Sequence, residues 1–417
     1  MSDRANRFAN SVFTLIAFLV LIAPVPVFAD QFLNDLRPTG TPFVFGLHGD
    51  YQFFLRGIER SGDPQGSHPF NSRIFHTLTL EPDVRLTSDF RFHARWRPIK
   101  NEILFDSDVD ANAFGAKAFE SNALERTFFE ARIFQIDTAG GLVPLEFHNF
   151  YMAQDDVGGL LVAKNNISSA SITNIRVMGF GTASGESSNL LGREKRNTAL
   201  FGVDAIADTQ NYTIEGTLGF LSDNSETTSA VGTPTAVGTP TAGNEGHVGL
   251  SVIRFRPERS IALRIFGNTN TENKKSGGLI VAEQSIIYHS TRWDRPTWYL
   301  NGFFGTEDYQ SMANGSLKNI GFLFDQTVGA PQLDNKGINA FGFATGFLMG
   351  ASRDLSIIPE IAAVLDQSNK NNNQVSGGIR VQTRLFDTSF LRWDTVFLQE
   401  TAVADRAATT LQAVYKF

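Results

Sequence analysis

Apolar and polar side chains alternate along most of the chain after residue 42. In the segment DFRFHARWRP, residues 89–98, apolar side chains occupy the even positions from 90 to 96 and basic side chains the odd positions from 91 to 97. The segments SFLRWDTVFL and GGIRVQTRLF repeat this arrangement. Because successive side chains of a strand point to opposite faces, the pattern predicts strands with one apolar face and one cationic face.

The connections between these segments alternate between short and long. RPERS, WDRPT, SRDLS and FDTS are short, whereas NTNTENKKSG and GTEDYQSMANGSLKNIG are long. Two stacked sheets of a soluble sandwich would show the same alternation of side chains but have no reason to sort their connections. Strand, short turn, strand, long loop is typical of a bacterial outer-membrane barrel, with the turns on the periplasmic side.

Alternation and turn spacing together predict an all-β protein, a transmembrane antiparallel up-and-down β-barrel of about 18 strands. The weakest strand is GGLLVAK, and removing one hairpin would leave 16. The predicted strands lie near 43–57, 73–86, 89–97, 124–136, 142–152, 158–164, 171–181, 198–208, 211–221, 247–257, 260–268, 279–292, 297–305, 338–350, 355–365, 376–386, 389–398 and 408–417.

The start of the chain reads as a secretory signal peptide over 1–29. Arg4 and Arg7 precede an apolar run over 12–23, and small residues lead to a cleavage point after Ala29. A membrane-anchoring helix is the alternative, but it needs ~20 apolar residues. We therefore assign 30–417 to the barrel and place it in the outer membrane of a Gram-negative bacterium.

One long connection, about 222–246, is of low complexity. It contains the tandem VGTPTA at 231–242 and has almost no residues able to form a core. We expect an extracellular loop there.

Composition narrows the chemistry. The chain has no cysteine, which excludes disulfides, c-type haem attachment and cysteine-ligated zinc or iron–sulfur sites. The net charge of −7 argues against a nucleic-acid partner.

The polar rows of the predicted strands are rich in arginine, while lysine is mostly confined to loops. Arginine keeps its charge and offers a forked set of donors where water is restricted, which suits a narrow lumen. Fewer acids share these rows, so the lumen should concentrate anions. The predicted lining residues are Arg91, Arg95, Arg97, Arg126, Glu130, Arg132, Arg176, Arg254, Arg256, Arg264, Arg380, Arg384 and Arg392.

No catalytic or cofactor motif survives inspection, so we expect neither an enzyme nor a bound cofactor. A lipase built on His148 or His289 with a nearby serine is the remaining enzyme alternative. Asp106, Asp108 and Asp110 alternate like the start of a calcium loop, but the later ligand positions of that motif do not match. We assign no metal, and a loose divalent site on this loop stays open.

Two segments, LERTFFEARIFQIDTAGGLVPLEF and RNTALFGVDAIADTQNYTIEGTLGF, together with the terminal AVYKF, resemble the alginate-export and related substrate-specific porin families. The resemblance implies an 18-stranded monomeric barrel with an electropositive channel. It also implies that Phe417 is the C-terminal signature read by the barrel-assembly machinery. Where the family pattern has Gly-Arg-Gln, this chain has HNFYMAQ, which leaves the substrate open.

We therefore expect a porin-like channel for anionic or polar small solutes, with acidic saccharides among the candidates. Its other partners are outer-membrane lipid and lipopolysaccharide. The alternative is a structural or adhesive barrel with a plugged lumen and partner-binding external loops.

Overall fold

The structure is a computed structural model of the chain. It describes residues 44–61, 70–87, 89–106, 116–117, 123–133, 136–149, 151–164, 174–183, 198–223, 244–271, 274–312, 317–325, 339–352, 354–367, 373–385, 389–400 and 405–416. The predicted signal peptide at 1–29, most of the loop at 222–246 and the terminal Phe417 lie outside these residues. Within them, no helix has the length and apolar character needed to cross a membrane.

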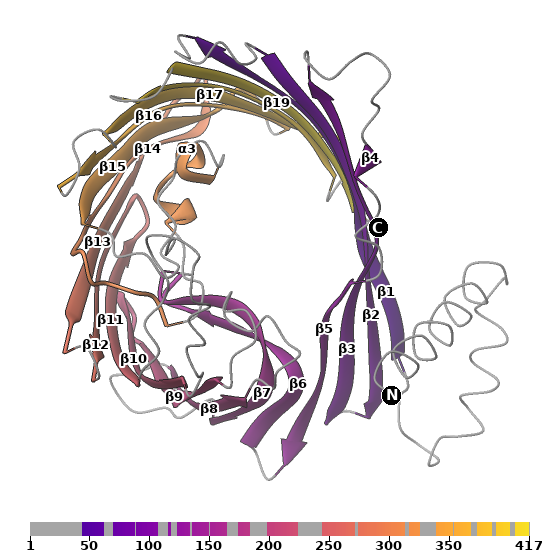
Figure 1. The fold of residues 1–417 in the computed structure, drawn as a ribbon, viewed down its shortest axis with the longest axis vertical. Coiled ribbons are helices and arrows are strands. Elements are labelled where there is room, and N and C mark those ends of the chain that lie inside the picture. Colours follow the sequence, from indigo (N-terminus) through magenta and orange to yellow (C-terminus); the bar gives the residue numbers. More distant parts are fainter. Residues whose placement is uncertain are drawn as a thin grey trace, which may run out of the picture.

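Eighteen antiparallel strands form a closed barrel in which neighbours in the chain are neighbours in the wall (Figure 1). The first strand pairs with both the second and the last, which closes the ring. A two-residue bridge, β4 (Ala116–Lys117), pairs with β3 beside this ring.

The wall strands follow in chain order. They are β1 (Val44–Ser61), β2 (Phe70–Thr87), β3 (Phe90–Asp106), β5 (Ala123–Ile133), β6 (Ile136–Phe147), β7 (Ala153–Lys164), β8 (Asn174–Ala183), β9 (Thr198–Asp208), β10 (Tyr212–Asp223), β11 (Glu245–Arg256), β12 (Arg259–Asn270), β13 (Ser276–Ile287), β14 (Asp294–Gly305), β15 (Ala340–Gly350), β16 (Leu355–Asp366), β17 (Gln374–Arg384), β18 (Phe390–Glu400) and β19 (Asp405–Lys416). Two short helical turns, η2 (Lys318–Ile320) and α3 (Phe322–Asp325), lie between β14 and β15.

The outer surface of the barrel is built from the apolar rows of the strands. Leu218 and Phe397 expose 65% and 64% of their surface, and Leu263, Ile361 and Ile379 are exposed in the same way. So much exposed aliphatic and aromatic surface is unfavourable in water and is what lipid-facing strands require.

Each predicted strand has a counterpart in the wall, and the differences are in the bounds. The strands predicted at 124–136 and 142–152 are β5 and β6, and the chain reverses direction where Ile133 of β5 lies directly opposite Ile136 of β6. Apolar residues flank this turn on both sides, so the alternation of side chains continues through it and gives no signal of the reversal.

The hairpin of β6 and β7 departs from the simple barrel. These strands pair with each other over 137–147 and 153–163, but β6 pairs with β5 only as far as Leu142. In the described residues, β7 pairs with β8 only over 159–164. The distal half of the hairpin therefore leaves the wall and projects into the interior, where α3 also lies (Figure 1).

Candidate functional site: a partly filled lumen

The strand register decides which side chains face the lumen, because residues directly opposite in neighbouring strands point to the same face. Arg264 is opposite Ser251 and Val281, and all three are buried, whereas Leu263 and Ile265 on the other face are exposed. Following this register around the ring places most of the predicted arginines on interior rows. These are Arg91, Arg95, Arg97, Arg126, Arg132, Arg176, Arg264, Arg380, Arg384 and Arg392, together with Glu130.

Arg254 and Arg256 lie on the outer face, and their predicted place in the lumen is wrong. Arg254 is directly opposite Tyr212 and Ile261, and Arg256 is opposite Arg259, on the rows that carry the exposed aliphatic residues. The prediction assumed a change of pleat inside HVGLSVIRFRP. The pairing of β11 with both neighbours runs without a register shift, so the interior positions are occupied by Ile253 and Phe255 instead.

Interior arginines gather on one arc of the wall, from β17 through β19 and β1 to β5, which we call the open arc. Here Arg91 bonds to Asp83 through Nε at 2.8 Å, and Arg380 bonds to Asp394 at 2.8 Å. The Nε of Arg95 lies 3.2 Å from Glu81. These pairs brace neighbouring strands. The side chains of Arg91 and Arg95 stay exposed by 39% and 31%, whereas that of Arg380 is exposed by only 12%.

The opposite arc, β8 to β16, is covered from inside by two chain segments, and we call it the covered arc. The first segment comprises residues 148–149 and 151–152, at the tip of the β6–β7 hairpin. The backbone N–H of His148 donates to Glu215 at 2.8 Å, and the hydroxyl of Tyr151 donates to Glu283 at 2.8 Å. Both acids belong to the wall, so the tip of the hairpin is fastened to β10 and β13.

The side chain of His148 completes a chain of hydrogen bonds across the covered arc. Its Nδ1 lies 2.6 Å from the hydroxyl of Ser251, and its Nε2 lies 2.9 Å from that of Thr217. Thr217 in turn donates to Asp204 at 2.6 Å, and Arg264 donates to Ser251 at 3.2 Å. Both ring nitrogens are therefore satisfied by the wall, which fixes the entry point of the inserted loop.

The second inserted segment comprises residues 306–312 and 317–325 and includes η2 and α3. The buried carboxylate of Glu360 accepts hydrogen bonds from the backbone N–H groups of Phe322 at 3.0 Å and Leu323 at 2.7 Å, and from the hydroxyl of Tyr299. At the border with the open arc, the guanidinium of Arg380 lies 4.7 Å from the centre of the Phe322 ring. One wall carboxylate thus holds the first turn of α3.

The two inserted segments also bind each other. The N–H of Met312 donates to the carbonyl of Met152 at 3.0 Å, and the amide of Asn319 donates to the carbonyl of Asn149 at 2.8 Å. They therefore form one unit inside the barrel.

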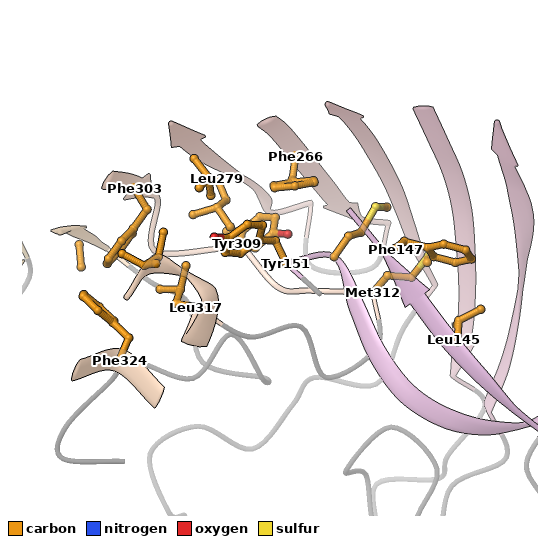
Figure 2. Close-up of a cluster of buried hydrophobic side chains, with 14 of the residues drawn as sticks. Leu145, Phe147, Tyr151, Phe266, Leu279, Phe303, Tyr309, Met312, Leu317 and Phe324 are labelled. Carbon is orange, nitrogen blue, oxygen red and sulfur yellow. The ribbon is translucent and has the colours of Figure 1, made fainter. Parts of the chain in front are cut away.

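A continuous apolar cluster seals this unit against the wall (Figure 2). Leu145, Phe147 and Tyr151 from the hairpin and Tyr309 and Met312 from the second segment are all buried. Wall residues Phe266, Leu279 and Phe303 complete the cluster. Where this cluster lies, the interior of the covered arc is packed like a protein core.

Glycines on interior rows make room for the inserted segments. A Cβ on Gly249 would lie 2.6 Å from Nε2 of His148, and a Cβ on Gly277 would overlap the backbone of Asp308 and Tyr309. These positions carry no charge or motif, so the sequence analysis did not single them out. Glycine at an interior strand position was the available signal.

The two arcs differ in charge among the residues whose side chains the structure describes. The open arc carries more arginines than carboxylates on its interior rows, with Asp50, Glu81, Asp83, Glu130 and Asp394 as the acids. The covered arc carries Arg176 and Arg264 against a larger set of acids. These are Asp204, Asp208, Glu215, Glu245, Glu283, Glu360 and Asp366. The charge distribution therefore produces a field across the lumen.

The structure shows no accessible arrangement for catalysis at the histidines considered from sequence. His148 and Ser251 are in contact, but they expose 1% and 0% of their surface. His289 lies in a turn at the other end of the barrel and pairs with Glu258 at 2.7 Å. His148, Asp204 and Glu215 bring ligand atoms within 4.8 Å of one another. The hydroxyls of Ser251 and Thr217 already occupy both ring nitrogens of His148, and Glu215 accepts from its backbone N–H.

Of the three aspartates considered for a divalent ion, Asp106 ends β3. Asp108 and Asp110 lie outside the described residues.

Comparison with solved structures relates this barrel to known proteins. OccK9 (OpdG) of Pseudomonas aeruginosa superposes with a TM-score of 0.56 at 8% identity, covering 89% of this chain and 98% of its own. OccAB3 of Acinetobacter baumannii gives a TM-score of 0.53 at 9% identity, covering 89% and 99%. The chain has the fold of an outer-membrane porin.

A third similar structure is Wzi of Escherichia coli, an outer-membrane protein involved in group 1 capsule assembly and a carbohydrate-binding β-barrel. It gives a TM-score of 0.52 at 9% identity, covering 93% of this chain and 86% of its own. None of the three is an alginate-export protein, so they support the porin part of the resemblance drawn from sequence. No protein-family model and no curated protein matches the chain.

Proposed function

We propose that this protein is a passive outer-membrane channel for small anionic or polar solutes, and that solutes pass along the open arc. The observation that carries the proposal is the division of the lumen. The inserted segments fill the side of the covered arc, and the interior arginines of the open arc face the space that is left.

The spacing of the arginines suits a succession of weak binding sites. Arg91 and Arg95 lie four residues apart on β3, and Arg380 and Arg384 four apart on β17, which corresponds to about 13 Å along a strand. A solute can be handed between sites at this distance without binding any of them tightly, as conduction requires. Acidic saccharides remain within this class of solute.

Planar-bilayer recording in a salt gradient tests the proposal. The wild-type protein should give discrete conductance steps and a reversal potential on the anion side. Reversing the charge with Arg91→Glu, Arg95→Glu and Arg384→Glu should move the reversal potential toward the cation side. A folded wild-type protein without conductance would exclude the channel.

The second candidate is a structural or adhesive barrel whose lumen is plugged. The observation in its favour is that the two inserted segments bind each other and the wall. Its test is the same recording, because a plugged barrel gives no steps. Retention of a capsular polysaccharide by this non-conducting protein would then support the adhesive role.

We propose three further features of the protein in the membrane. Lipopolysaccharide and phospholipid surround the apolar outer rows, the short turns face the periplasm, and Phe417 addresses the chain to the barrel-assembly machinery.

A further inference from the structure

Three arginines lie on the outer surface at the short-turn end of the β11–β12 hairpin. They are Arg254, Arg256 and Arg259, and we call them the basic rim. Arg256 is directly opposite Arg259, and Arg254 is opposite Ile261 on the next outward pair. They face away from the lumen, so solute passage does not use them.

The basic rim lies at the border of the apolar outer surface that is nearer the short turns. The outward pairs that follow it along the hairpin are Val252 with Leu263 and Leu250 with Ile265. Leu250, Leu263 and Ile265 are all exposed. Cationic groups at this border lie at the depth of the lipid head groups.

An aromatic side chain on the neighbouring strand fits this depth. Tyr212 is directly opposite Arg254, and the guanidinium carbon of Arg254 lies 5.5 Å from the centre of its ring. Tyrosine is enriched at membrane interfaces, where its ring contacts chains and its hydroxyl contacts head groups. Two independent features therefore place the basic rim at the depth of the lipid head groups: the end of the apolar rows and the position of Tyr212.

No carboxylate in the described part of the chain forms an ion pair with the arginines of the basic rim. The Nε of Arg254 is buried and has no hydrogen-bond partner there. Glu258, the acid in the adjoining turn, is bonded to His289 at 2.7 Å. Guanidinium groups at a lipid border are costly unless an anion accepts from their accessible nitrogens.

We propose that the basic rim binds the phosphate head group of an anionic phospholipid. Guanidinium groups match phosphate oxygens with paired donors, and basic clusters at a membrane surface attract anionic lipids. The acyl chains would lie along the exposed rows of Leu250, Leu263 and Ile265. Short turns of outer-membrane barrels face the periplasm, so the lipid comes from the phospholipid leaflet and not from lipopolysaccharide.

Native mass spectrometry of the purified full-length protein, titrated with phosphatidylglycerol or phosphatidylethanolamine, tests this site. The wild-type protein should retain phosphatidylglycerol in preference to phosphatidylethanolamine by on the order of fivefold or more, the contribution of one basic residue at an anionic surface. The variant Arg254→Gln, Arg256→Gln, Arg259→Gln should lose this preference. A variant with lysine at all three positions keeps the charge but loses the paired donors. Its phosphatidylglycerol preference should lie between those of the wild type and the glutamine variant, because both charge and paired hydrogen bonds contribute.

A matched control removes the same charge from the lumen. The variant Arg91→Gln, Arg95→Gln, Arg384→Gln should keep the lipid preference of the wild type. Heat-dependent migration in electrophoresis checks that each variant is folded, and the double variant Arg256→Gln, Arg259→Gln, at exposed positions, replaces the triple variant if that one does not fold. Equal retention of both lipids by the wild type, or an unchanged preference in the basic-rim variants, would overturn the proposal.

Discussion

The covered arc and the open arc are built from strands with the same alternation, yet their interior rows differ in kind. On the covered arc these rows hold glycines, aliphatic residues and buried acids, and two of those acids, Glu215 and Glu360, accept from the backbone of an inserted segment. On the open arc they hold arginines paired with acids of neighbouring strands, such as Arg91 with Asp83. The outer rows are apolar on both.

The alternation along a strand determines whether a side chain faces the lumen or the lipid. The composition of the interior row determines whether that side chain packs against protein or faces water. A charged interior row remains wet, because burying its ions would cost several kcal/mol each. A row of glycines and aliphatic residues is stable only if something packs on it. The two arcs should therefore respond differently to substitution, in stability on one side and in ion selectivity on the other.

The largest effect is expected from removing the anchor of α3. Glu360→Leu leaves the N–H groups of Phe322 and Leu323 and the hydroxyl of Tyr299 without their acceptor, and each buried unsatisfied group costs about 1–3 kcal/mol. The second inserted segment should leave the wall, and the conductance should rise several-fold in planar-bilayer recording. Glu360→Gln keeps an acceptor oxygen and should give a smaller rise. Equal conductance in all three proteins would show that Glu360 does not hold the segment.

Filling the space beside Gly277 should displace the same segment by a different route. Gly277→Val places a side chain into the backbone of Asp308 and Tyr309, and overpacking of this kind costs about 1–3 kcal/mol. Limited proteolysis should cut the 306–325 segment faster than in the wild type. The neighbouring Gly278 faces outward with its nearest contact at 3.5 Å, so Gly278→Val is the matched control and should leave the cleavage rate unchanged.

A third substitution tests the hairpin tip. Glu283 accepts from Tyr151 and pairs with Arg264 at 2.9 Å. Glu283→Gln keeps the shape but removes the charge, which should weaken the fastening of 148–152 by about 1–2 kcal/mol. Hydrogen exchange of that segment should accelerate accordingly. Unchanged protection would mean that the apolar cluster alone holds the tip.

The smallest effect on stability is expected on the open arc. Arg384 is exposed on the interior row at the end of β17, and exposed substitutions usually change stability by less than about 0.5 kcal/mol. Arg384→Gln should therefore leave the denaturant midpoint of the folded protein in lipid vesicles unchanged. The same variant should reduce the preference of the channel for anions. A loss of stability without a change in selectivity would contradict the assignment of ion selectivity to the open arc.

Much of the wall could be predicted from sequence, because a period of two and a sorted series of turns constrain a barrel strongly. The register placed Arg91 and Arg380 inward as the alternation requires. Arg254 and Arg256 failed because one assumed change of pleat moves every following side chain to the other face. At the rim of a barrel, arginine occurs on both the inner and the outer face. The local pattern therefore does not decide which face these two arginines occupy.

The filled half of the lumen could not be predicted in the same way. Tyr151 and Tyr309 belong to connections, and their burial depends on contacts with strands far away in the chain, such as that of Tyr151 with Glu283 on β13. From sequence, the acids of the polar rows differ only in their positions. Nothing there indicates that Glu215 and Glu360 accept from loop backbones or that Glu283 accepts from a loop tyrosine. Interior glycines were visible but are common in barrels of every kind.

Modification of introduced cysteines by a charged thiol reagent during bilayer recording tests the central claim most directly, since the chain has no cysteine of its own. Arg384→Cys on the open arc and Ser251→Cys beneath the inserted hairpin should both conduct before the reagent is added. We expect the reagent to reduce the current through Arg384→Cys and to leave that through Ser251→Cys unchanged. Equal block at both positions, or no block at Arg384→Cys, would contradict a solute path along the arginine-bearing wall.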